Sequence, residues 1–123
     1  MADSSITFGQ LTAMATETRA YRAGQAIFEK GEVGFELFVI KRGEVELRLG
    51  ERVLRTLGTG DIFGEMALVD DSTRSASAIA LSDVEIVPVS EKQFVGLIRE
   101  TPSFALDVMR VLAQRLRVET RKT

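Results

Sequence analysis

Short apolar runs separated by glycines fill the middle of the chain, residues 21–89. In the segment EVELRL, Val45, Leu47 and Leu49 alternate with charged residues, which is the period-two pattern of a half-buried strand. The pattern stops at Gly50, which opens an expected two-residue hairpin loop. About eight short strands joined by turns of this kind predict an antiparallel, jelly-roll-like β-roll.

One of the expected strands, VEIVPV, contains a proline at position 88. Because proline has no N–H group to donate to a neighbouring strand, it is confined to edges or to positions outside the hydrogen-bond ladder. We therefore expect VEIVPV to be an edge strand, or Pro88 to lie at a position that is not hydrogen-bonded.

Helical patterns flank the strands on both sides. In residues 1–20 the apolar residues of TFGQLTAMATETR recur every three positions, which predicts a short amphipathic helix. Ser90 is the expected N-cap of the helix SEKQFVGLIRE, which ends before Pro102. A longer helix then runs to the C-terminus, so two helices occupy residues 90–123. The predicted fold is mostly β with flanking helices.

The long C-terminal helix carries two neighbouring apolar lines. The first line repeats in the three- and four-residue steps of a coiled-coil seam and comprises Leu106, Met109, Ala113 and Leu116. The second line comprises Val108, Val111 and Val118. Two interpretations are open: one line packs on the strands and the other forms a homodimer, or both lines form a single wide stripe buried in the monomer.

The composition fits one globular domain and removes several classes of function. The chain has 123 residues, of which 45% are hydrophobic and 28% charged, and it shows no internal repeat, so a single domain spans residues 1–123. A net charge of −2 argues against direct nucleic-acid binding and against attachment to a membrane surface. The chain lacks both Cys and His, so we expect no disulfide, no metal site and no catalytic cofactor.

The sequence also bears on location and catalysis. It contains no long apolar run, and its first residues, MADSSITFGQ, lack the pattern of a signal peptide, so we expect a cytoplasmic protein without a membrane segment. Enzymes built on small barrels usually hold their metals with His clusters, which this chain cannot supply. We therefore expect no enzymatic activity.

The segment FGEMALVDDSTRSASA contains one Glu and one Arg among small residues. Arg74 offers a planar fork of donors suited to a phosphate, and Glu65 offers an acceptor suited to sugar hydroxyls. A turn of helix after Gly64 would direct backbone N–H groups toward an anion, while alanines leave room for a ligand near the backbone. These residues describe a pocket for a phosphate and hydroxyls carried by one ribose. The alternative is a surface ion pair between Glu65 and Arg74.

The order of these residues resembles the phosphate-binding cassette of the cyclic nucleotide-binding domains. That family's motif reads Phe-Gly-Glu-x-Ala-Leu, a short variable run, and Arg-x-Ala-Ser/Thr. The chain matches it from Phe63 to Ser77, and we call residues 63–77 the cassette. The segments YRAGQAIFEKGEVGFELFVIKRGEVEL and SEKQFVGLIRETP extend the resemblance over nearly the whole chain.

The resemblance implies a role for each residue of the site. Glu65 would bind the ribose 2′-hydroxyl and Arg74 the exocyclic phosphate of cAMP or cGMP. Backbone N–H groups of Gly64, Met66 and Ala67 would line the sugar-phosphate, and Ser75 would add a phosphate contact. The apolar residues expected against the base are Val45, Leu47, Phe63, Ala76 and Ala78.

Three details of this site remain open in the sequence. Ser75 follows the arginine directly, so its hydroxyl could bond to a guanine amino group or to phosphate alone. In the family, residues of the long C-terminal helix cover the base. Thr120 is the candidate here, against the alternative of a solvated last turn. Phe35 stands where many members carry a small polar residue, and we expect it in the core or as a wall of a loop.

The resulting hypothesis is a cyclic nucleotide sensor, stand-alone or excised, because no further domain follows the long helix. Ligand capture would order the cassette and reposition the C-terminal helices, which an output protein or a missing effector domain would read. The competing hypothesis is a β-roll that binds no nucleotide and serves as a dimerisation or protein-interaction module.

Overall fold

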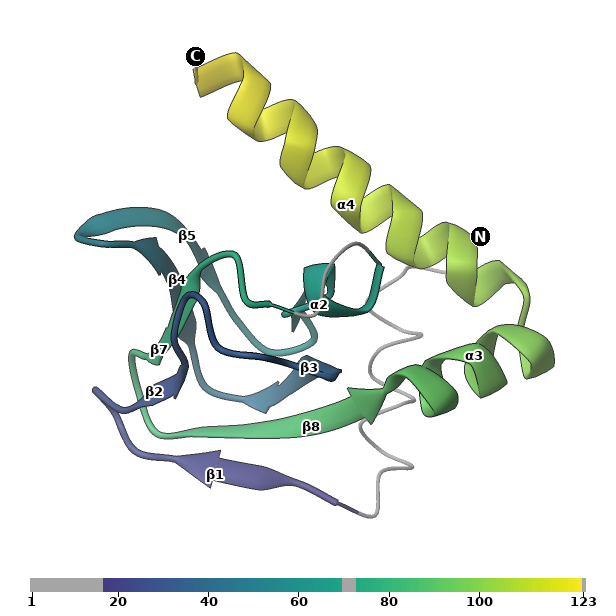
Figure 1. The fold of residues 1–123 in the computed structure, drawn as a ribbon, viewed down its shortest axis with the longest axis horizontal. Helices are drawn as coiled ribbons and strands as arrows, with labels where there is room; N and C mark the ends of the chain where they lie inside the picture. Colours follow the sequence, from purple (N-terminus) through teal and green to yellow (C-terminus); the bar gives the residue numbers. More distant parts are fainter. Residues whose placement is uncertain (1–16, 70–72, 123) are drawn as a thin grey trace.

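The computed structural model describes residues 17–69 and 73–122, and the side chains of Val69 and of residues 118–122 are not part of this description (Figure 1). The helix predicted around Phe8, Leu11 and Met14 lies outside the described residues. Among the described helices, none has the length and apolar character needed to cross a membrane.

Two four-stranded sheets form the body of the protein, and every pairing within them is antiparallel. The first sheet has the order β1 (Arg19–Tyr21), β8 (Val84–Ser90), β3 (Glu36–Arg42) and β6 (Ile62–Phe63). The second has the order β2 (Ala26–Phe28), β7 (Ser77–Ala80), β4 (Val45–Leu49) and β5 (Arg52–Leu57). The predicted antiparallel roll is confirmed, with eight strands in the described part of the chain.

Local sequence signals account for the turns. Leu49 pairs with Arg52, so Gly50 and Glu51 form the predicted two-residue loop between β4 and β5. Gly50 has a φ of +60°, a conformation that costs little for glycine and that hairpin loops of this length require.

Pro88 lies in β8, which is an inner strand of its sheet, so the edge-strand alternative is wrong and the alternative of a position outside the hydrogen-bond ladder is left. The pairing between β1 and β8 runs from Tyr21 opposite Val84 to Arg19 opposite Ile86. At Pro88 the ladder therefore continues on the β3 side, where the residue lies opposite Phe38. Because the β1 strand stops before this point, the missing N–H group of the proline is tolerated inside the sheet.

The hydrophobic core lies between the two sheets and is centred on three phenylalanines. The ring centroids of Phe28, Phe38 and Phe63 are 5.3 to 6.1 Å apart. Such spacing is favourable for aromatic packing. The strands β2, β3 and β6 each supply one ring, so this cluster joins the two sheets.

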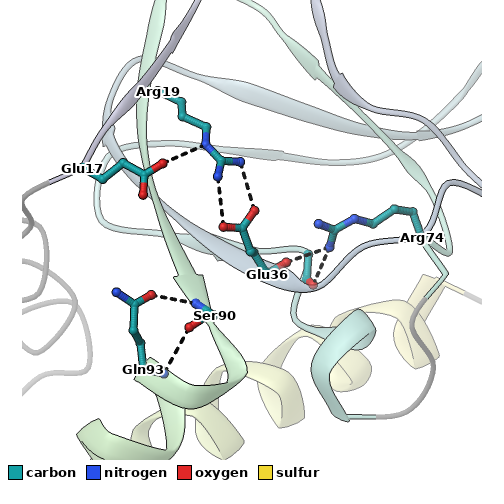
Figure 2. Close-up of polar contacts among 7 residues, drawn as sticks. Glu17, Arg19, Glu36, Arg74, Ser90 and Gln93 are labelled. Atoms are coloured by element: carbon teal, nitrogen blue, oxygen red, sulfur yellow. Dashed lines mark hydrogen bonds and ion pairs between the residues drawn. The ribbon is translucent and has the colours of Figure 1, made fainter.

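Three helices follow the sheets: α2 (Met66–Val69), α3 (Glu91–Glu100) and α4 (Ser103–Lys122). Ser90 caps α3 as predicted, since its hydroxyl accepts from the Gln93 N–H and the Gln93 side chain accepts from the Ser90 N–H (Figure 2). The α4 helix then crosses one end of the roll and extends past α2 toward the strands β4 and β5 (Figure 1).

The two apolar lines of α4 have different surroundings. Phe104 and Val108 are buried against Leu37, Val39 and other residues of the first sheet. Leu106, Met109 and Leu116 are 50%, 57% and 67% exposed, and Ala113 is exposed as well. In the monomer, therefore, Val108 and Val111 of the second line pack on the roll. Leu106, Met109 and Ala113 of the first line face solvent, and Leu116 is largely exposed but also borders the cavity described below. The two lines thus do not form a single wide buried stripe.

Phe35 is 69% exposed, so the expectation that it belongs to the core is wrong. The β3 ladder begins one residue later, where Glu36 lies opposite Ser90. Phe35 therefore belongs to the connection between β2 and β3 and has no paired strand position to cover it. Val33, two residues earlier, is 61% exposed in the same connection.

Candidate functional site

A cavity of about 520 Å³ lies beside the cassette, between the second sheet and α4. Most of the residues predicted for the site line it, namely Gly64, Glu65, Met66, Ala67, Arg74, Ser75 and Ala76. The remaining lining residues are Phe28, Leu47, Leu49, Leu54, Arg55, Leu112, Arg115 and Leu116. The fold thus brings residues from β2, β4, β5, the cassette and α4 around one space.

Some of the predicted residues lie elsewhere. Phe63, Val45 and Ala78 have no exposed surface and belong to the core cluster between the sheets. Their position favours a packing role behind the cavity, whereas Leu47 and Ala76 reach the cavity itself. Thr120 falls within the span of α4, but its side chain lies outside the described residues.

Arg74 is a buried cation, only 6% exposed, that is held by backbone oxygens. Its Nη1 donates to the Glu36 carbonyl at 2.8 Å and to the Gly64 carbonyl at 2.9 Å (Figure 2). Its guanidinium carbon also lies 4.3 Å from the ring centroid of Phe28, within the range of a cation–π contact. These contacts fix the guanidinium at one wall of the cavity.

Two glycines make room for this arginine. A Cβ atom built on Gly34 would lie 2.2 Å from the Arg74 Nε, and one on Gly64 would lie 2.9 Å from Nη1. Gly64 also has a φ of +79°, which other residues rarely adopt. The cassette motif therefore needs a glycine at position 64 to leave room for the Arg74 side chain. The same side chain also requires a glycine at position 34, which the sequence did not reveal.

Burial lowers the pKa of the Arg74 guanidinium, and the nearby carboxylates of Glu36, Glu32 and Glu65 oppose this effect. An arginine keeps its charge even after such a shift, because its ordinary pKa is so high. The cavity therefore presents a permanent, partly desolvated positive charge, which is the condition under which an anion is bound most strongly.

Glu65 is also buried, 7% exposed, and its partner comes from α4. Arg115 donates from Nη1 to the Glu65 Oε1 at 2.6 Å, and from Nη2 to the Ile62 carbonyl. The alternative of an exposed ion pair between Glu65 and Arg74 is therefore wrong. Each of the two buried charges has its own partners, and the contact between Glu65 and Arg115 joins residues that are 50 positions apart.

Burial lowers the pKa of Arg115, with the neighbouring Arg55 acting in the same direction and Glu65 opposing it. Arg115 was not among the residues predicted for the site. A signal was present, because Arg115 is seven residues beyond Val108, two helical turns along the docked face of α4. An arginine in that register is aimed at the roll rather than at solvent.

Arg55 is a second lining arginine that the sequence analysis did not single out. It lies opposite Leu47 on the neighbouring strand, and Leu47 in turn lies opposite Ala78. Side chains directly opposite each other in an antiparallel pair share a face of the sheet. Arg55 is thus placed in the row of the second sheet that faces the cavity.

The predicted turn of helix after Gly64 is present as α2. The Ala67 N–H points back to the Gly64 carbonyl at a long distance of 3.4 Å, and the Leu68 N–H donates to the Glu65 carbonyl at 3.0 Å. The long Ala67 contact is weak by geometry, so this N–H group can exchange it for a stronger acceptor.

The arrangement combines a buried cation, a buried carboxylate and an apolar wall around one cavity. An anionic group fits at Arg74, and hydroxyl groups fit at Glu65. Leu47, Leu54 and Leu112 supply an apolar surface for a flat ring. A nucleotide whose phosphate and ribose hydroxyl lie close together satisfies all three requirements.

Comparison with known proteins supports the same conclusion. Residues 18–101 match the family model of the cyclic nucleotide-binding domain. The cyclic AMP receptor protein of Thermus thermophilus is 41% identical over 106 residues, covering 82% of this chain and 49% of that protein. A cGMP-dependent protein kinase of Plasmodium berghei is 40% identical over 106 residues, covering 85% of this chain and 12% of the kinase. The chain therefore spans half or less of these relatives.

Solved structures resemble the fold closely. The crystal structure of the Thermus thermophilus catabolite activator protein matches with a TM-score of 0.81 and 35% identity, over 99% of this chain and 58% of that one. A protein of a cyclic-GMP-dependent signalling pathway in bacterial phytopathogenesis matches with a TM-score of 0.77 and 30% identity, over 95% of both chains. With the family model matched and the cassette residues gathered around one cavity, this chain belongs to the cyclic nucleotide-binding domain family.

Proposed function

We propose that residues 1–123 act as a cyclic nucleotide sensor in which Arg74 binds the exocyclic phosphate and Glu65 the ribose 2′-hydroxyl. The main observation behind this proposal is that both charged side chains are buried and line one cavity of about 520 Å³ beside the cassette. In this proposal Ser75 and the N–H groups of Gly64, Met66 and Ala67 complete the sugar-phosphate site.

The Glu65–Arg115 ion pair supplies the connection from ligand to helix. A ribose hydroxyl that bonds to Glu65 changes the carboxylate on which Arg115 depends, and Arg115 belongs to α4. Binding would therefore shift the balance between two positions of α4, by the difference in ligand affinity of those positions. An output protein or a further domain would read the position of α4.

We further propose that guanine is the preferred base. Arg55 lines the cavity on the sheet side and Ser75 on the cassette side. Arginine pairs favourably with the O6 and N7 acceptors of guanine, whereas the corresponding edge of adenine presents a donor at N6. The Ser75 hydroxyl can accept from the guanine amino group, which adenine lacks.

The relatives suggest a regulatory role rather than a catalytic one. Their names include a cyclic AMP receptor protein and regulatory subunits of cAMP-dependent protein kinases. We propose a homodimer through the exposed line of α4, and no direct contact of this chain with nucleic acid or with a membrane. A cytoplasmic location follows from the same proposal.

The test is calorimetric titration of the purified, ligand-free chain with cAMP and cGMP separately. We expect binding in the micromolar range or tighter, and a loss of about a hundredfold or more in Arg74→Ala, which removes the charge-assisted bonds to phosphate. A folded chain that binds neither nucleotide contradicts the sensor function and favours a dimerisation or protein-interaction module.

The base preference has a separate test. Arg55→Met should weaken cGMP binding and leave cAMP binding nearly unchanged, because in this proposal the Arg55 guanidinium contacts only the base of the ligand. Ser75→Ala should weaken the binding of both nucleotides, and that of cGMP more, because the Ser75 hydroxyl contacts the guanine amino group in addition to the sugar-phosphate. Equal losses for both nucleotides would contradict guanine readout while leaving the sensor function intact.

A further inference from the structure

Arg19 of β1 holds the side chain of Glu36 with both arms of its guanidinium group (Figure 2). Its Nη1 and Nη2 donate to the two Glu36 carboxylate oxygens, each at 3.0 Å, and its Nε contacts Glu17 at 3.3 Å. The bond to Glu36 is the main reason that the pKa of Arg19 is raised. A two-armed pair fixes orientation better than a single contact does.

Glu36 has a second role, through its backbone. Its carbonyl oxygen accepts from Arg74, so one residue joins Arg19 at its side chain and Arg74 at its main chain. Both guanidinium groups also approach the ring of Phe38, at 6.0 Å for Arg19 and 5.3 Å for Arg74. Figure 2 shows the resulting series from Glu17 through Arg19 and Glu36 to Arg74.

Glu36 lies at the first position of β3, where the strand is paired on one side. It is opposite Ser90 of β8, whereas the pairing with β6 involves Phe38 and Val39. Strand ends of this kind open more easily than strand centres. The Arg19–Glu36 pair ties this end to β1 and so keeps the carbonyl that receives Arg74 in place.

The charge of Glu36 matters as well. Burial lowers the pKa of Arg74, and the Glu36 carboxylate is the largest of the contributions that raise it. Arg19 binds this carboxylate through two hydrogen bonds and so offsets part of its negative charge. Without Arg19, an unpaired carboxylate would stand beside the cation that must receive the phosphate, and it would compete for that cation.

We propose that Arg19 is a positioning residue for nucleotide binding: through Glu36 it holds the carbonyl contact of Arg74 and keeps the Glu36 carboxylate from competing with the phosphate. The proposal rests on the phosphate role of Arg74. According to this proposal, Arg19 of β1 affects ligand affinity although it lies outside the cassette and does not line the cavity.

The test is the dissociation constant of the better-bound cyclic nucleotide for Arg19→Ala, measured by calorimetry on the full chain. We expect binding to weaken by roughly threefold to tenfold, the range of coupling between groups in one network. Adding Glu36→Gln to Arg19→Ala should restore part of the affinity, because the competing charge is then gone. A purely structural role of Arg19 predicts no such recovery.

The matched control is Arg42→Ala. Arg42 also pairs with a glutamate between β3 and β8, Glu85 at 3.0 Å, but at the other end of the strand. Its removal should leave the affinity unchanged. If Arg19→Ala is insoluble, Arg19→Lys keeps the charge without the two-armed geometry and should weaken binding by a smaller factor.

Two results would overturn the proposal. One is an unchanged affinity in Arg19→Ala, or in Arg19→Lys where that variant replaces it. The other is an equal loss from the Arg19 substitution in wild-type and Arg74→Lys backgrounds, since Arg19 would then not act through Arg74. A wild-type chain that binds no cyclic nucleotide fails at an earlier step and contradicts the sensor function instead.

Discussion

At the scale of single residues, the site depends on two buried charges that already have partners inside the protein. Arg74 donates to two backbone carbonyls, and Glu65 accepts from Arg115. Burying a charge is costly unless it is paired and hydrogen-bonded. These internal partners therefore stabilise both buried charges and fix the orientation of both groups.

Glu65→Gln tests the carboxylate without changing its size. The amide keeps an acceptor but loses the charge-assisted bond, so we expect cyclic nucleotide affinity to fall by roughly tenfold, less than in Arg74→Ala. Titration calorimetry of both variants checks this order. An affinity equal to that of the wild type would show that Glu65 does not contact the ribose.

Gly34→Ala tests the space beside Arg74. The added Cβ would overlap the guanidinium group, which lies at the end of a flexible side chain and can move away. We therefore expect a folded protein with weakened nucleotide binding. Thermal unfolding and calorimetry together measure the two effects.

Gly58→Ala is the control for this substitution, because a Cβ at Gly58 meets nothing within 4 Å. It should leave the affinity unchanged. If Gly34→Ala binds the nucleotide as tightly as the wild type does, the observed position of the Arg74 guanidinium is not the one used in binding.

At the scale of elements, α4 is attached to the roll in two different ways. Phe104 and Val108 pack against the first sheet, whereas the Arg115 side chain contacts Glu65 and the Ile62 carbonyl beside the cavity. Apolar packing does not depend on a ligand, but the ion pair involves Glu65, the residue proposed to bind the ribose. If Glu65 binds the nucleotide as proposed, the later turns of α4 are the part of this helix that we expect binding to move.

Arg115→Ala should release those turns. It removes both polar contacts to the roll and leaves the Glu65 carboxylate without its cation, so we expect faster amide hydrogen exchange in α4 from Leu112 onward. Exchange around Phe104 should change little. Arg117→Ala is the control, because Arg117 is exposed on the same helix.

Comparable exchange in the Arg115 and Arg117 variants would show that the ion pair does not hold α4. In that case the coupling between ligand and helix would have to pass through Leu112 and Leu116, which also line the cavity.

At the scale of the whole molecule, α4 exposes large apolar residues that the monomer does not cover. Leu106, Met109 and Leu116 repeat in coiled-coil steps and are 50%, 57% and 67% exposed, although Leu116 also borders the cavity. A contiguous apolar surface of this kind on a folded chain marks an interaction site. A second copy of α4 satisfies the same spacing, which is the basis of the proposed homodimer.

Met109→Glu tests this interface, because Met109 is 57% exposed and does not line the cavity. A charge at the centre of the seam should convert a dimeric parent chain to monomers in sedimentation velocity. Gln114→Glu, exposed on the same helix but outside the apolar line, should leave the dimer intact. A parent chain that sediments as a monomer would contradict the seam.

Much of the architecture was predictable because it depends on neighbouring residues. Alternation around Val45 and Leu47 places β4, a glycine at position 50 closes its hairpin, and Ser90 caps α3. The cassette residues were predictable as a group since their order is a motif. The core position that we allowed for Phe35 was wrong, because apolar character alone does not say where a ladder begins.

The sequence by itself determined the strands and turns, the helix caps and the composition of the cassette, because each of these rests on short-range periodicity and backbone preference. Only the tertiary structure decided which distant charges meet. Arg115 is 50 residues from Glu65, and Arg74 is 38 residues from Glu36. Such contacts depend on how the sheets and α4 pack against each other. The packing sets the distances between these elements, and no local pattern in the chain encodes them.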